Sequence, residues 1–159
     1  GVDVFDGRAY IPKTYVKEVG LRIDLYKQLS IVDCDKKLAR LFDNMVDRFG
    51  KYSKPIDLLY KNQILKILAY KLFIVAISRR GFCVDMILLP SKYTKNTPLL
   101  IDCVGCFSRD RFVQYTFKAA SEKRLNIMFD FDNSADEDIY MFLFDLLNKF
   151  RNKFSGNSK

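Results

Sequence analysis

The chain has 159 residues, of which 49% are hydrophobic and 29% are charged, a size and composition typical of one folded globular domain. Its net charge of +8 would attract nucleic acid or acidic protein surfaces, although the basic residues are spread along the chain. The absence of histidine and of a glycine-rich phosphate loop argues against an enzyme, and the apolar stretches are too short to span a membrane.

The first half of the chain predicts three helices. Residues 1–10 are expected to be a linker from a preceding domain, and Ile11-Pro12 begins an extended segment because proline restricts the residue before it. Apolar residues at helical spacing predict a helix from Leu21 to Leu29, a second started by Asp33 or Asp35 and ending at Phe49, and a third from Ser53 or Pro55 to Leu72. Gly50 is the expected C-terminal cap of the second helix, in the left-handed conformation that glycine adopts without cost.

The second half changes to the two-residue period of strands. Two β-hairpins are predicted, one with strands over residues 73–77 and 83–87, the other with strands over residues 112–117 and 125–129. The segment from Leu99 to Phe107 lies between them and is more typical of a helix than of a strand.

A final helix is predicted over residues 139–150, started by a capping box of Ser134 and Glu137. The order of elements indicates an α+β fold, with N-terminal helices followed by two β-hairpins and with interposed and C-terminal packing helices. Residues 11–152 would form the single domain and residues 153–159 a flexible tail. We expect the helices at residues 56–72 and 139–150 to cover the hairpins, because a hairpin alone is not stable.

Four cysteines raise the question of a metal or redox site. Cys103 and Cys106 have the spacing of half a zinc site, but only Cys34 and Cys83 remain as further thiol ligands, each distant in sequence. A redox pair would need a strand-helix-strand unit that the sequence does not predict. We therefore expect small buried thiols and predict no metal, no cofactor and no catalytic residue in this chain.

Aromatic and basic residues lie close together near the second hairpin. A stacking platform for single-stranded nucleic acid is one interpretation, and filling of the core by alternating aromatic residues is the other. The residues concerned are Phe107, Phe112, Tyr115 and Phe117, near Arg109, Arg111 and Lys118. The candidate nucleic-acid contacts are Arg79, Arg80, Arg109 and Arg111, and a basic nucleic-acid-binding module is the alternative function.

Several linked motifs lie between residues 11 and 59. They are Ile11-Pro12-x-x-Tyr15, Arg22, Leu25-Tyr26-x-x-Leu29, Asp47-Arg48-Phe49-Gly50, Pro55 and Leu59. In order and spacing they resemble the C-terminal domain of the bacterial transcription-repair coupling factor. Asp47 and Arg48 lack an obvious packing role, since they lie where a helix ends. An exposed pair of this kind is worth little to stability by itself, about 0–1 kcal/mol.

The resemblance implies a non-catalytic, autoinhibitory domain of an ATP-dependent DNA translocase that acts in transcription-coupled nucleotide-excision repair. It implies docking on the UvrB-like N-terminal domain of the same protein, where the domain masks the surface that binds UvrA. Asp47 and Arg48 would be contact residues, with Asn44 one turn earlier, where the family has an acid. RNA polymerase, UvrA and duplex DNA would be indirect partners through the parent protein. A cytoplasmic location and a monomeric fragment are expected.

Overall fold

The computed structural model of the chain describes residues 1–93, 97–121 and 123–154. The helices of the described part are α1 (Val19–Ile31), α2 (Asp35–Phe49), α3 (Lys54–Lys71), α4 (Thr97–Asp110) and α5 (Asp136–Phe154), with a 3-10 helix at Pro90–Tyr93. Its strands are β1 (Val2–Asp3), β2 (Ile74–Arg80), β3 (Cys83–Leu88), β4 (Gln114–Ser121) and β5 (Arg124–Asp130). The three N-terminal helices, the two hairpins and the interposed and C-terminal helices confirm the predicted α+β class.

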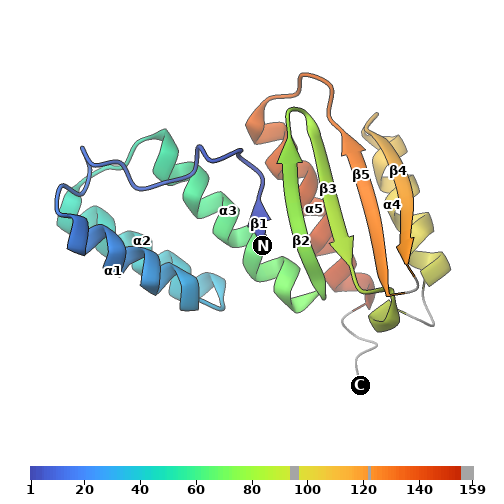
Figure 1. Cartoon of the computed structure of the whole chain (residues 1–159), viewed down its shortest axis with the longest axis horizontal. Coiled ribbons are helices and arrows are strands. Elements are labelled where there is room, and N and C mark those ends of the chain that lie inside the picture. Colours follow the sequence, from blue (N-terminus) through green and yellow to red (C-terminus); the bar gives the residue numbers. More distant parts are fainter. Residues whose placement is uncertain (94–96, 122, 155–159) are drawn as a thin grey trace.

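The two hairpins join into a single sheet. The strand order is β1-β2-β3-β5-β4, in which β1 runs parallel to β2 and the other pairs are antiparallel. The pairing of β3 with β5 connects the hairpins, and it places β4 at one edge of the sheet. Figure 1 shows α1 and α2 at one end of the molecule, the sheet with α4 and α5 at the other, and α3 between them.

The apolar core has two parts that share α3. The larger part lies between the sheet and α3, α4 and α5, and it includes Leu65 and Leu68 from α3. The smaller part lies between α1, α2 and α3, and it includes Ile56 and Leu59 from α3. The expectation that α3 and α5 cover the hairpins is therefore confirmed, and α4 joins them through residues such as Leu100.

The first residues of the chain belong to the folded domain. Val4 and Phe5 are fully buried, and the backbone of this segment is held by the buried side chain of Asn62 on α3. The Asn62 amide nitrogen donates to the Val2 carbonyl at 2.7 Å, and its oxygen accepts from the Val4 N–H at 3.0 Å. The description of residues 1–10 as a linker is wrong for residues 2–5, whereas a connection to a preceding domain stays a prediction.

The start of α5 differs from the predicted capping box. The Ser134 hydroxyl donates to the Phe131 carbonyl, and the helix begins two residues later at Asp136. The Glu137 carboxylate accepts a hydrogen bond from Lys61 on α3, so it joins two helices instead of closing a cap. At the other end, Lys153 and Phe154 belong to the helix and Phe154 is buried, which corrects the predicted tail at these two residues. Residues 155–159 lie outside the described part of the chain.

Candidate interdomain contact at the end of α2

The last turn of α2 is held by Tyr15 from the segment before α1. The Tyr15 hydroxyl lies 3.1 Å from the Met45 carbonyl oxygen and 2.6 Å from that of Gly50, two carbonyls at the helix end. The Tyr15 ring packs on Phe49, with the ring centroids 5.7 Å apart. Burial raises the pKa of Tyr15, which keeps the hydroxyl protonated and able to donate.

Gly50 ends α2, as the sequence predicts, but not in the left-handed helical conformation. Its φ of 89° and ψ of −173° lie in a region that is open essentially to glycine alone. The Gly50 N–H still donates to the Val46 carbonyl at 2.8 Å, which closes the last helical turn. The glycine therefore turns the chain sharply after Phe49 and fixes where α2 ends.

Two other motif residues hold the segment that leads into α1. The Arg22 guanidinium donates to the carbonyls of Val16 and Lys17, at 2.7 and 3.0 Å. The Tyr26 hydroxyl oxygen accepts the backbone N–H of Ile11 at 2.7 Å. These side chains satisfy polar groups of an irregular segment that no strand or helix would pair. The fold therefore explains why Arg22 and Tyr26 belong to the motif set.

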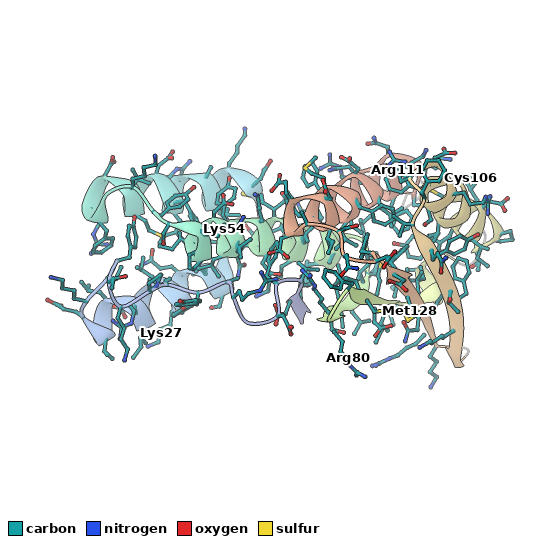
Figure 2. The ribbon with its side chains drawn as sticks, turned by 90° about the horizontal axis from the view of Figure 1, so that it is seen from above. Lys27, Lys54, Arg80, Cys106, Arg111 and Met128 are labelled. Atoms are coloured by element: carbon teal, nitrogen blue, oxygen red, sulfur yellow. The ribbon has the colours of Figure 1, made fainter. Side chains whose placement is uncertain are left out.

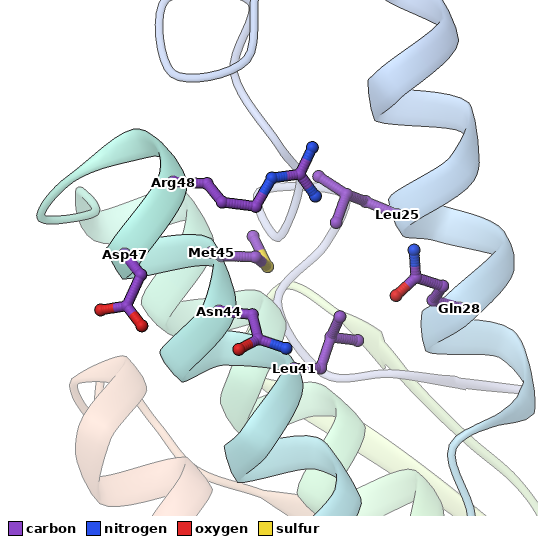
Figure 3. A pocket seen from close by; sticks show the side chains of 7 residues that line it. All are labelled: Leu25, Gln28, Leu41, Asn44, Met45, Asp47 and Arg48. Atoms are coloured by element: carbon purple, nitrogen blue, oxygen red, sulfur yellow. The ribbon is translucent and has the colours of Figure 1, made fainter.

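Asn44, Asp47 and Arg48 are the exception, because all three are exposed on the surface of α2. They border a small hollow of about 160 Å³ between α1 and α2, together with Leu25, Gln28, Leu41 and Met45. In Figure 3 the Arg48 side chain reaches toward Leu25 of α1, while Asn44 points into the space between the helices. The Asp47 carboxylate points away from α1 (Figure 3), so the acid and the base are presented in different directions.

The charges of Asp47 and Arg48 are available to a partner. Among the described residues, no ion pair involves either side chain. The Arg48 guanidinium lies over the Phe49 ring, 4.8 Å from its centroid, which orients the group without neutralising its charge. The end of α2 therefore exposes a donor and the Asn44 amide toward α1 and an acceptor directed away from α1.

The four arginines proposed as nucleic-acid contacts do not form one surface. The Arg79 side chain is only 6% exposed and is paired with Asp136, so this candidate is wrong. Arg80 is exposed on the sheet face opposite to Arg111, as Figure 2 shows. Arg109 and Arg111 lie together at the end of α4. The structure thus brings together two of the four.

The aromatic residues of this region divide in the same way. Phe107 is buried in the core against Phe142, with ring centroids 5.1 Å apart, so it cannot stack on a base. Tyr115 and Phe117 are half-buried, whereas Phe112 is almost fully exposed. Core filling explains Phe107, and Phe112 is left without a packing role.

The cysteines of the Cys103-Val104-Gly105-Cys106 motif lie on one turn of α4. Cys103 is buried, and burial raises the pKa of its thiol, which keeps it protonated. Cys106 is exposed, contrary to the expectation that both are buried. Within residues 1–93, 97–121 and 123–154, no cluster of three or more cysteine or acidic side chains could hold a metal ion.

An ion cluster around Asp136 was not predicted. The Asp136 carboxylate accepts hydrogen bonds from Arg8, at 2.6 and 2.9 Å, and from Arg79, at 2.7 Å. These guanidinium groups lower the pKa of Asp136 to about 2. The cluster is structural, because it joins the N-terminal segment, β2 and the start of α5. In the sequence, only the position of Asp136 at the start of the last helix indicated a role, because acids are favoured at helix N-termini.

Comparison with known proteins then decides the family. A family model described as the TRCF domain matches residues 5–98, which is more than half of the chain. The chain belongs to the TRCF domain family. The match covers α1, α2, α3 and the first hairpin, and therefore the whole of the surface at the end of α2.

Curated relatives of this TRCF domain are transcription-repair-coupling factors. The protein from Bacillus subtilis (strain 168) is 38% identical over 61 residues, which are 38% of this chain and 5% of the relative. A protein of the same name from Staphylococcus epidermidis (strain ATCC 12228 / FDA PCI 1200) is 28% identical over 82 residues, 52% of this chain and 7% of the relative. The chain thus spans less than a tenth of the length of these relatives.

The fold of the TRCF domain is shared with a solved structure, the crystal structure of the C-terminal domain of a transcription-repair coupling factor. The TM-score is 0.77 at 20% identity, and the match covers 99% of this chain and 94% of the other. This likeness extends the shared fold beyond residue 98 to the second hairpin and α5. In the described part of the chain, no helix combines the length and apolar character needed to cross a bilayer.

Proposed function

We propose that this TRCF domain is an autoinhibitory module of an ATP-driven DNA translocase in transcription-coupled nucleotide-excision repair. The domain docks through the end of α2 on the UvrB-like N-terminal domain of the same protein and masks the surface that binds UvrA. It contributes no chemistry of its own. Its indirect partners, through the parent protein, are UvrA, RNA polymerase and duplex DNA.

One observation supports the docking surface above all. In the motif segment Asp47-Arg48-Phe49-Gly50, Phe49 packs on Tyr15 and Gly50 turns the chain, whereas the two charged residues are exposed. Neither is ion-paired within the described part of the chain. A motif residue that the fold does not use is a candidate for contact with a partner. The position of Asn44 beside the same hollow extends this surface by one turn.

The energetics of such a surface suit a switch. If Asp47 and Arg48 are desolvated against a partner, truncating one of a charged pair costs roughly 2–5 kcal/mol. Moving a two-state equilibrium from about 1:99 to about 99:1 requires roughly 5.5 kcal/mol of differential binding. A few charged contacts can therefore hold the closed state, and engagement of stalled polymerase and DNA can release it.

The experiment is a binding measurement between this chain and the UvrB-like N-terminal domain of the same protein. The double variant Asp47→Ala/Arg48→Ala should lose binding. The control Arg80→Ala/Asp102→Ala also removes one acid and one base, but at exposed positions on β2 and α4, away from α1 and α2. It should bind like the wild type. Equal binding by both double variants and the wild type would refute the docking surface.

A further inference from the structure

Phe112, in the turn between α4 and β4, is unusual in two respects. Its φ is +58°, in the left-handed region that side chains larger than glycine seldom occupy. Its side chain is 95% exposed, so the ring gains nothing from burial. A bulky residue that is both strained and exposed is an outlier from which a functional role can be inferred.

The end of α4 explains the backbone but not the side chain. The Val113 N–H donates to the Ser108 carbonyl at 2.9 Å, and the Phe112 N–H donates to the Arg109 carbonyl at 3.1 Å. These two bonds form the Schellman motif, in which the residue at the position of Phe112 is usually glycine. The backbone conformation at residue 112 therefore favours glycine, and the phenyl ring has no role in stabilising the fold.

Two guanidinium groups are held near the end of α4, and one of them, that of Arg109, lines the same hollow as the Phe112 ring. Arg109 Nη1 donates to the Tyr115 hydroxyl at 2.7 Å, and Gly105 leaves room for this pair, since a Cβ there would lie 2.8 Å from Arg109 Nη1. The Arg111 guanidinium lies 3.5 Å from the centroid of the Phe107 ring. Both cations are thus oriented by aromatic neighbours and remain exposed.

An open hollow completes this surface. It has a volume of about 610 Å³ and is lined by Arg109, Phe112, Val113, Gln114 and Tyr115. We propose that it binds single-stranded nucleic acid, with an unpaired base stacked on Phe112 and the adjoining phosphate contacted by Arg109, the cation of its lining. Single-strand binding surfaces combine aromatic platforms with cations that follow the backbone. This inference goes beyond the docking role and does not depend on it, because α4 lies at the opposite end of the molecule from α2 (Figure 1).

Charge complementarity decides between this occupant and an apolar pocket of a protein. A pocket that received the Phe112 ring would have to desolvate the neighbouring Arg109 guanidinium, which is costly without a paired acid. A nucleotide presents a flat aromatic face and an anionic phosphate together, and the net charge of +8 favours it further. In a duplex the base faces are stacked on each other, so a ring such as Phe112 has access only to unpaired bases.

The test is fluorescence anisotropy with a labelled oligothymidylate and a labelled blunt duplex. Wild type should bind the single strand more tightly than the duplex. Phe112→Gly should weaken single-strand binding by about tenfold, with an unchanged or higher melting temperature, because glycine suits the backbone of this residue. Phe73→Gly is the matched control, because Phe73 also has a left-handed backbone, with φ of +56°, and a partly exposed ring. It should bind like the wild type.

A second pair of variants tests the charges. Arg109→Gln should reduce the salt dependence of single-strand binding by about 0.7 in log–log slope for one lost phosphate contact. Arg80→Gln removes the same charge from the other face of the sheet and should leave that slope unchanged.

The proposal is overturned if Phe112→Gly binds like the wild type, if the duplex binds as tightly as the single strand, or if no binding occurs at low salt. An anchor for a protein pocket would give the first or the last of these results.

Discussion

Arg79 of β2 donates a hydrogen bond to the Asp136 carboxylate at 2.7 Å, although 57 residues separate the two in the sequence. Their side chains are 6% and 16% exposed, so the pair is largely removed from water. Arg8 adds two further hydrogen bonds to the same carboxylate. Since Asp136 opens α5, its charge also faces the positive end of the helix. This cluster holds the N-terminal segment, the sheet and the last helix together.

Asp136→Asn should destabilise the domain by about 3 kcal/mol, because it leaves the buried Arg79 charge without a counter-ion. Urea unfolding followed by circular dichroism measures the change. The companion variant Arg8→Gln should cost less than about 1 kcal/mol, since the Arg8 side chain is 51% exposed. A loss below about 1 kcal/mol for Asp136→Asn would show that the cluster does not stabilise the fold.

The same carboxylate predicts how stability depends on pH. The pKa of Asp136 is lowered from 3.8 to about 2 in the folded chain, so the folded state favours the ionised form. Its stabilisation is fully present above pH 4 and is lost as the pH falls toward 2, a change of about 2 kcal/mol. Urea unfolding at several pH values between 5 and 2 should show this loss in the wild type. In Asp136→Asn the unfolding free energy should depend less steeply on pH over this range. Equal slopes in the two proteins would contradict the assignment of this dependence to the Asp136 carboxylate.

The hydrophobic period was sufficient to predict α1, α2, α3, α5 and both hairpins. It could not predict β1, because a strand of two residues carries no period and Val4 and Phe5 are buried only through contacts with distant elements. Local patterns thus predicted the elements, while the short segment that completes the sheet depends on tertiary structure.

The polar residues were harder to assign for a related reason. Arg79 was expected to contact nucleic acid, since its partner Asp136 is far away in the sequence. Glu137 was expected to close a capping box, but it accepts a hydrogen bond from Lys61 of α3. In contrast, the exposure of Asp47 and Arg48 followed from the predicted end of α2, because the helix period fixes which residues face solvent.

Tyr15→Phe should loosen the end of α2 that carries Asp47 and Arg48. The variant removes the hydroxyl that lies 2.6 Å from the Gly50 carbonyl oxygen, but it keeps the ring on Phe49. We expect a loss of about 1 kcal/mol in unfolding free energy, together with faster amide exchange at residues 47–50. Tyr70→Phe, at a side chain that is 84% exposed, is the control and should change neither quantity. Unchanged exchange in Tyr15→Phe would mean that the hydroxyl does not hold this turn.

Asn44→Glu should strengthen docking on the UvrB-like domain. Asn44 occupies a position where the family resemblance implies an acid, and its side chain borders the same hollow as Asp47 and Arg48. A restored carboxylate should lower the dissociation constant several-fold, roughly 1 kcal/mol, with stability changed by less than about 0.5 kcal/mol. Asn44→Gln adds length without charge and should bind like the wild type. Isothermal titration calorimetry would compare the three proteins, and equal affinities would place residue 44 outside the interface.

The proposed autoinhibition requires that this domain mask the UvrA-binding surface of the protein to which it belongs. The most direct test measures UvrA binding to the intact protein, in the wild type and in Asp47→Ala/Arg48→Ala. Masking predicts that the wild type binds UvrA weakly and that the double variant binds it at least tenfold more tightly, because the closed state is lost. Equal UvrA affinities in the two proteins, with both folded, would contradict autoinhibition through the end of α2.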